Sequence, residues 1–282
     1  MSASGSPSSL ASRPGPPASR PGTVTLGPLR VNTVTQAECV AHVLRELEAG
    51  RGGWLLTANL DHLRLCDLDP DYLRLCREAS LVVADGMPLV WASRLQRTPL
   101  PERVAGSDLL GNLCAAAASA GRSVYLLGGA PGVADAAARV LRDRHPALRL
   151  CGVQSPEPGF ERDASALARI AAGVREARPD LVCLGLPKPK QERLIAELRR
   201  VLPQAWFLGV GFGFSFLSGG VRRAPPWMQQ RGLEWLHRLA QEPRRLSRRY
   251  LVQGVPAGLR LLGAAALRRA NPTGSPSARP DD

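Results

Sequence analysis

An aspartate and a glycine close a short apolar run in the first third of the chain. The run LVVA at 81–84 indicates a buried strand, and Asp85 and Gly86 follow it directly. Aspartate–glycine pairs are common in turns, so a turn without any chemical role explains the pair. A carboxylate at a strand tip also lies where open α/β sheets bind their ligands, and there it could accept a proton. These residues alone leave both interpretations open.

Two further stretches place polar or flexible groups after an expected strand. Thr57 and Asn59 could hold a ligand with a hydroxyl and an amide, although capping of the next helix is the commoner role of such residues. Gly128 and Gly129 lie between a strand and a helix, where backbone N–H groups could approach a phosphate. Their spacing does not match the dinucleotide-binding fingerprint, so the glycine loop alone is weak evidence.

A proline-rich loop presents two lysines at the start of a helix. The stretch GLPKPKQE at 185–192 carries Lys188, Lys190 and Gln191. Cations at a helix N-terminus oppose the helix dipole, so an anionic ligand would help to explain them. A solvated lysine loop explains them equally well.

The order of apolar runs and helical patterns predicts the elements that position these residues. Strands are expected in GGWLLTANLDH, LVVAD, SVYLLGG, LRLCGV, DLVCLGL and QAWFLGVGFGF. Helices are expected between them, at 61–78, 87–96, from an N-cap at Ser107 to 121, over PGVADAAARVLRDRH, and at 161–177 and 189–201. This alternation predicts βαβ units in an α/β fold with a mostly parallel sheet flanked by helices.

The composition changes after Gly220 and divides the chain. Residues 222–269 contain eleven arginines against two glutamates and show no strand pattern. We therefore predict a disordered tail at 1–24, an α/β body at 25–220, a basic helical appendage at 221–269 and a second disordered tail at 270–282. The name appendage is kept below for residues 221–269.

The bulk composition narrows the classes of function. A formal net charge of +13 favours an anionic partner, whereas 3 Tyr and 5 Phe are few for an RNA-stacking surface. The six cysteines form no CxxC pair, and no group of histidines, cysteines or carboxylates has metal-ligand spacing, so we expect reduced cysteines and no metal. We find no signal-peptide core and no run of roughly 18 uninterrupted apolar residues that would span a membrane.

Taken together, these stretches resemble the WecG/TagA/CpsF glycosyltransferases. The resemblance covers roughly residues 25–252 and lies in TAN, VVADGMPLVWASR, PERVAGSDLL, YLLGGAPGVADAAARVL, DLVCLGLPKPKQE and the run from GVGFGF to RRLSRRYL. It implies a Rossmann-like body with a C-terminal helical segment that meets a membrane. It also implies an inverting, metal-independent transfer, without a cofactor, of an N-acetylmannosamine-type sugar. The sugar would pass from a UDP donor to N-acetylglucosamine on a polyprenyl diphosphate. The product would serve the synthesis of a teichoic acid, common antigen or exopolysaccharide.

The resemblance also implies roles for individual residues. Asp85 matches the candidate base of the family's ADG motif, and Thr57, Asn59 and Gln191 match its pocket positions. We add Arg103 and the Gly128–Gly129 loop as substrate-binding candidates. Without a metal the leaving diphosphate needs cations, and the appendage arginines best suited to it are Arg238, Arg245 and Arg248. Their spacing of seven and three favours one helical face, although Pro243 interrupts it.

The chain departs from the family pattern at two places. Met87 and Pro88 follow Gly86 where the family usually has a second glycine-like opening. Ser215 stands where the family often has aspartate, which could change sugar or nucleotide selectivity. The expected partners are the UDP-sugar, the polyprenyl-linked acceptor and an anionic membrane surface, with a homo-oligomer left open and no nucleic acid. The expected location is cytoplasmic and peripheral, on the inner face of the cell membrane.

Two other classes of function remain as alternatives. A nucleotide-dependent oxidoreductase or sugar epimerase would share the sheet, but it should carry GxGxxG after the first strand, where this chain has TANLDH. A nucleic-acid-binding module would explain the positive charge and leave the strand-tip residues without a role.

Overall fold

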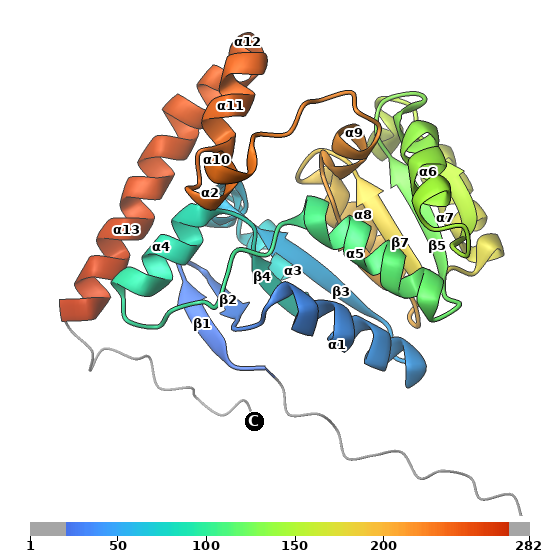
Figure 1. Ribbon diagram of the computed structural model, residues 1–282, viewed down its shortest axis with the longest axis horizontal. Helices are drawn as coiled ribbons and strands as arrows, with labels where there is room; N and C mark the ends of the chain where they lie inside the picture. Colours follow the sequence, from blue (N-terminus) through green and yellow to red (C-terminus); the bar gives the residue numbers. More distant parts are fainter. Residues whose placement is uncertain (1–20, 271–282) are drawn as a thin grey trace, which may run out of the picture.

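A six-stranded parallel sheet forms the centre of the molecule. The structure is a computed structural model that describes residues 21–270, shown in Figure 1. The strands of this sheet are β3 (Gly53–Ala58), β4 (Leu81–Ala84), β5 (Ser123–Gly128), β6 (Arg149–Gln154), β7 (Leu181–Gly185) and β8 (Trp206–Gly209). Their order is β4-β3-β8-β7-β5-β6, and every neighbouring pair is parallel. The predicted fold class is confirmed.

Helices cover both faces of the sheet, which explains why its strands are continuous apolar runs. Every residue of β3, β4, β5, β7 and β8 is buried, whereas the edge strand β6 is only partly covered. One face packs against α2 (Leu60–Leu68), α3 (Pro70–Arg77), α7 (Ala164–Ala177) and α8 (Lys190–Val201). The other packs against α1 (Gln36–Glu48), α5 (Gly106–Ser119), α6 (Val133–Arg144) and α9 (Gly213–Leu217). A short turn of helix, η1 (Phe160–Arg162), precedes α7.

A hairpin that the sequence analysis missed covers one edge of the sheet. Strands β1 (Thr23–Leu26) and β2 (Leu29–Asn32) pair antiparallel through a turn at Gly27, where φ is 57°. The Asn32 side chain accepts a hydrogen bond of 2.8 Å from the backbone N–H of Val82 in β4. The hairpin thus occupies groups of an edge strand that would otherwise be free to pair with another chain.

Two helix predictions are corrected. The helix expected at 61–78 is broken into α2 and α3, because Pro70 has no N–H to continue α2 and Asp69 caps the new helix through its side chain. The helix expected to begin at an N-cap Ser107 begins at Gly106, with Ala105 at the N-cap and no side-chain cap. In both cases the elements lie where the pattern placed them, and only their ends differ.

The appendage is helical and lies along α4 (Met87–Leu95), as Figure 1 shows for its long last helix. Its helices are α10 (Pro226–Gln230), α11 (Glu234–Gln241), α12 (Pro243–Ser247), the π-helical η2 (Arg248–Gly254) and α13 (Val255–Ala270). Leu261 and Ala265 of α13 are buried in the core on the α4 side. Gly232, just before α11, is so close to α4 that a Cβ there would lie 2.5 Å from the Cβ of Met87. The appendage is therefore packed on the body.

The last helical run combines a long apolar stretch with interrupting arginines. The run Pro243–Ala270 is 28 residues long and apolar enough to cross a membrane by length and composition, with 17% of its apolar window buried. Arg260 interrupts it, which is why a search for uninterrupted apolar residues passed over it. Most of the two predicted tails, 1–20 and 271–282, lies outside the described residues, whereas Thr23 and Val24 belong to β1 and Ala270 to α13.

Candidate active site

A cavity of about 590 Å³ opens at the carboxyl ends of the sheet strands. Its walls come from the loops that follow β3, β4, β7 and β8 and, opposite them, from α11, η2 and α13 of the appendage. The loop after β3 leads to a helix on one face of the sheet, and the loop after β8 leads to a helix on the other face. Neighbouring strands whose connections diverge in this way create the crevice in which α/β proteins bind ligands.

Two side chains hold the strand ends of this crevice together. The Thr57 hydroxyl donates a hydrogen bond of 3.1 Å to the carbonyl of Gly209, across β3 and β8. The Gln191 amide oxygen accepts from the backbone N–H groups of Leu186 and Gly211, each at 3.3 Å. A Cβ at Gly209 would lie 2.2 Å from the Gln191 amide nitrogen, so a larger residue there would displace the Gln191 amide. The loops after β7 and β8 are therefore cross-linked beside the cavity.

Asp85 lies at the tip of β4 and lines the cavity. Its backbone N–H donates to the carbonyl of Ala58 at 2.7 Å, which continues the β3–β4 ladder by one bond and fixes the residue. Burial raises the pKa of the carboxyl to about 6, although the nearby charges of Arg103 and Lys188 act in the opposite direction. A carboxylate with this pKa can both lose and accept a proton near neutral pH.

Ion pairs join the appendage to the body beside Asp85. Arg103 donates to Glu234 of α11 at 3.0 Å and lies 3.9 Å from Asp108 of α5. Arg223 of the appendage forms a bidentate pair with the same Asp108, one of its bonds at 2.9 Å, and lies 3.5 Å from Glu234. Arg103 and Asp108 of the body thus pair with Glu234 and Arg223 of the appendage. These ion pairs hold α11 over the cavity.

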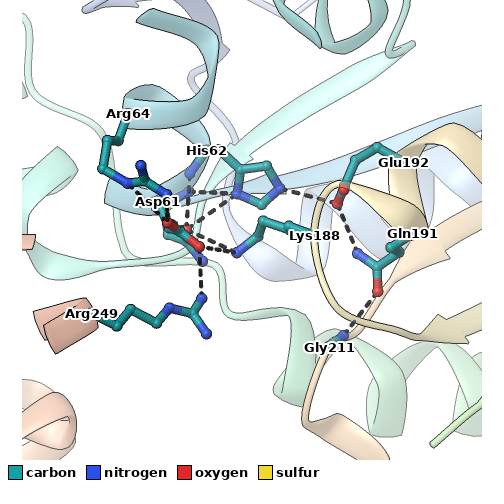
Figure 2. Close-up of polar contacts among 9 residues, drawn as sticks. Asp61, His62, Arg64, Lys188, Gln191, Glu192, Gly211 and Arg249 are labelled. Atoms are coloured by element: carbon teal, nitrogen blue, oxygen red, sulfur yellow. Dashed lines mark hydrogen bonds and ion pairs between the residues drawn. The ribbon is translucent and has the colours of Figure 1, made fainter. Parts of the chain in front are cut away.

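A buried hydrogen-bonded chain supports the floor of the cavity, as Figure 2 shows. The Asn59 side chain caps α2 by accepting from the N–H groups of Asp61 and His62. His62 contacts the Asn59 backbone N–H through Nδ1 at 3.2 Å and Glu192 through Nε2 at 3.3 Å. Burial lowers the pKa of His62 to about 4, so the ring is neutral, accepting at Nδ1 and donating at Nε2. Gln191 also donates to Glu192 at 3.0 Å.

Three cations surround a single carboxylate at the start of α2 (Figure 2). Asp61 lies 3.0 Å from Arg64, 2.9 Å from Arg249 and 3.9 Å from Lys188. Lys188 also donates to the Asn59 amide oxygen at 3.2 Å. Burial opposes the charged form of Asp61, but the three cations hold its pKa below the usual value. We call these four residues the Asp61 cluster.

Two further cations of the lining stack on an aromatic ring. Arg238 and Arg245 lie over the ring of Phe212, at 4.7 and 4.6 Å from its centre. Arg245 also pairs with Glu242. The Nε and Nη2 atoms of Arg238 are buried and have no hydrogen-bond partner among residues 21–270. Buried guanidinium N–H groups without partners are costly unless a ligand satisfies them, and a phosphate is the ligand that they fit best.

The sequence comparisons agree with this geometry. The pattern of the Glycosyl transferase WecG/TagA/CpsF family matches residues 24–271. The chain belongs to this family. Two relatives, both named N-acetylglucosaminyldiphosphoundecaprenol N-acetyl-beta-D-mannosaminyltransferase, come from Bacillus subtilis strain 168 and Bacillus spizizenii. The first is 31% identical over 64% of this chain and 68% of its own length. The second is 33% identical over 72% of this chain and 76% of its own length.

Seven predicted site residues of this glycosyltransferase line one cavity. They are Thr57, Asn59, Asp85, Arg103, Gln191, Arg238 and Arg245. Thr57, Asn59 and Gln191 also have the structural bonds given above, so the capping role considered for Asn59 is real and coexists with its place in the lining. Among residues 21–270, no group of three or more histidines, cysteines or carboxylates is arranged to hold a metal ion.

Three predicted residues lie outside the lining. Gly128 is buried and Gly129 donates its N–H to the carbonyl of Gly185 at 2.8 Å, so this loop packs β5 against β7 at the same edge of the sheet. Arg248 is exposed, and the next residue, Arg249, lines the cavity in its place. The seven-and-three spacing assumed a regular helix, whereas α11 ends before Pro243 and the wider π-helical turn begins at Arg248.

The sequence analysis did not select Asp61, Arg249 or Glu234. It left open whether Lys188 binds an anionic ligand or lies in a solvated loop. Each lies within a few residues of a position that was selected, but its partner is far away in the chain. Asp61 and Arg249 are 188 residues apart. Charged residues flanking Asn59 and Arg248 were the only local signal.

Proposed function

We propose that this glycosyltransferase moves an N-acetylmannosamine-type sugar from a UDP donor to N-acetylglucosamine carried on a polyprenyl diphosphate. The names of both relatives specify that sugar and that acceptor for those proteins. The single observation that supports the chemistry most is the placement of Asp85 in the same cavity as Arg238 and Arg245. A base and cations in one cavity are what a transfer from a nucleotide sugar requires.

Asp85 acts as the base in this proposal. The acceptor hydroxyl oxygen forms a bond to the anomeric carbon, and its proton passes to the Asp85 carboxylate as the bond from that carbon to UDP breaks. Attack opposite to the leaving group inverts the anomeric centre. The β-linked product in the relatives' names supports inversion, because it would arise so from an α-linked donor. Arg103 and Lys188 keep the carboxyl ionised near neutral pH against the effect of burial.

Arg238 and Arg245 stabilise the departing UDP. The bonding electron pair leaves with the diphosphate, whose growing charge needs donors that are already in place. The unpartnered N–H groups of Arg238 would supply them, and the Phe212 ring fixes both guanidinium planes. Because these arginines provide the positive charge, the proposed transfer needs no metal ion.

The appendage brings the enzyme to its lipid-linked acceptor. Val252, Leu259 and Leu267 are 67%, 66% and 71% exposed along the last helical run, which also carries arginines. Exposed apolar side chains among arginines favour contact with an anionic membrane surface. We therefore place the protein at the inner face of the cell membrane, held there by its appendage.

The test is a panel of UDP-sugars with a short-chain polyprenyl-diphosphate N-acetylglucosamine acceptor, scored by UDP release and by the mass of the product. We expect release of UDP only when acceptor is present, and fastest with UDP-N-acetylmannosamine or a close derivative. Transfer from a different nucleotide, or release of UDP that ignores the acceptor, would contradict the proposal.

A further inference from the structure

The Asp61 cluster gathers three cations around one carboxylate, and the nearby carboxylates of Glu192 and Asp85 offset only part of this charge. Arg64, Lys188 and Arg249 share Asp61, and the side chains of Lys188 and Asp61 are only 13% and 20% exposed. Like charges gathered in a partly buried site repel one another unless an anion joins them. The pKa of Lys188 is lowered by burial and by the charge of Arg249, although Asp61 acts against this. The excess of cations faces the cavity and points to a second anionic ligand group there.

An apolar surface continues directly from this cluster. Leu60 precedes Asp61 in α2, while Val255, Leu259 and Leu262 follow Arg249 in the same helical run, and Trp91 faces them from α4. All five line the cavity. Trp91, Val255 and Leu259 are 38%, 45% and 66% exposed, so the surface is open rather than filled by the core. A Cβ at Gly258 would lie 3.5 Å from Leu60, in ordinary contact across this surface. We call these five residues the apolar channel.

The neighbouring chemistry fits one kind of ligand. An isoprenoid diphosphate has a doubly or triply negative head joined directly to a branched apolar chain. The Asp61 cluster and the apolar channel likewise place cations next to apolar side chains in the lining of one cavity. Arg238 and Arg245 lie instead over Phe212, in the loop after β8, and Arg238 also lies over Phe216 of α9. The cavity therefore offers two groups of cations with different neighbours, one around Asp61 and one on the Phe212 ring, and the proposed reaction has two diphosphates.

We propose that Lys188, Arg249 and Arg64 bind the diphosphate of the polyprenyl-linked acceptor, with its first isoprene units in the apolar channel. Arg238 and Arg245 are then left to the donor. This assignment rests on the proposed function. It agrees with the position of Asp85, since Lys188 is near enough to influence its carboxyl, and an acceptor sugar attached to a diphosphate at Lys188 would lie beside the base.

The test measures binding of farnesyl diphosphate and of UDP to the full-length protein by titration calorimetry, alone and together. We expect both to bind at once, with farnesyl diphosphate tighter than inorganic diphosphate because of the channel. Lys188→Met should weaken farnesyl diphosphate about tenfold or more and leave UDP within about twofold, since a charge-assisted contact is worth about 1.5–3 kcal/mol. Leu259→Asp should weaken farnesyl diphosphate without changing inorganic diphosphate.

Two matched variants complete the design. Arg238→Met should weaken UDP and spare farnesyl diphosphate, and Arg260→Met removes an exposed charge of α13 outside the lining and should change neither. Displacement of farnesyl diphosphate by UDP, or unchanged affinity in Lys188→Met, would overturn the assignment. Sugar transfer by the wild type is measured separately. If the proposed function is wrong, transfer will be absent although both ligands still bind.

Discussion

Asp85 depends on its neighbours for its proton affinity. Burial raises its pKa to about 6, while Arg103 and Lys188 oppose that rise. The base must be ionised to accept a proton, so kcat/KM should increase with pH through about 6 and level off above it. Removing a cation in Arg103→Gln should raise the pKa of Asp85 and move this acid limb to higher pH. Rates measured from pH 5 to 8 test this, with the exposed Arg142→Gln as the control. An acid limb that stays in place in Arg103→Gln would contradict the assignment.

Glu192 joins the floor of the cavity to the core. It is fully buried, accepts from His62 and Gln191, and keeps a lowered pKa because these hydrogen bonds and the charge of Lys188 outweigh the effect of burial. Glu192→Ala leaves both donors without an acceptor and should lower the free energy of unfolding by about 3 kcal/mol. Urea denaturation measures this, and Glu197→Ala, an exposed position on the same helix, should cost far less. Equal losses in the two variants would show that the buried chain contributes little.

Site residues that are marked by their immediate sequence neighbours could be predicted from the sequence. Asp85 follows an apolar run directly, and Asn59 stands where a helix must be capped, so strand ends alone identified them. Arg249 and Asp61 could not be predicted, because their pairing depends on how the last helical run lies across α2. Arg248 was chosen instead of Arg249 because a regular helical period was assumed over a segment that contains a proline and a π-helical turn.

At the scale of elements, the strands of the central sheet were predictable and their ends were less so. Buried parallel strands are short, mostly apolar runs, and five of the six strands in this sheet are wholly buried and alternate with helices. The β1–β2 hairpin was missed although Gly27 and Pro28 mark a turn between alternating residues. The break at Pro70 was missed because apolar spacing continues across it. Local steric rules, rather than periodicity, decide both features.

The last helical run should carry membrane binding through its exposed side chains. Deletion of the appendage would also uncover core residues such as Leu261, so substitutions are the sharper probe. Val252→Asp with Leu267→Asp should reduce binding to anionic vesicles at least about tenfold, because each large apolar side chain contributes about 1.5–3 kcal/mol when it leaves water. Co-sedimentation with vesicles measures the change. Val201→Asp, an exposed apolar position on α8, is the matched control, and equal binding by all three proteins would contradict the role given to this run.

At the scale of the whole molecule, we propose that the positive charge takes the place of a metal ion. The net charge of +13 is concentrated partly in the appendage, and two groups of cations line one cavity. Transfer should therefore continue at its full rate in excess EDTA, and high salt should weaken vesicle binding by screening the arginines. Loss of turnover in EDTA with recovery on adding Mg²⁺ or Mn²⁺ would contradict the metal-independent reaction.

The fold, the appendage and the cations together serve one proposed step, the transfer of the acceptor proton to Asp85. The most direct measurement is turnover of UDP-N-acetylmannosamine with a short-chain polyprenyl-diphosphate N-acetylglucosamine by wild type, Asp85→Asn and Asp143→Asn. Asp143 is an exposed carboxylate of α6 outside the cavity lining, so its variant should match the wild type. Asp85→Asn should bind UDP normally and lose turnover on the order of a hundredfold or more. Near-normal turnover in Asp85→Asn would contradict the account.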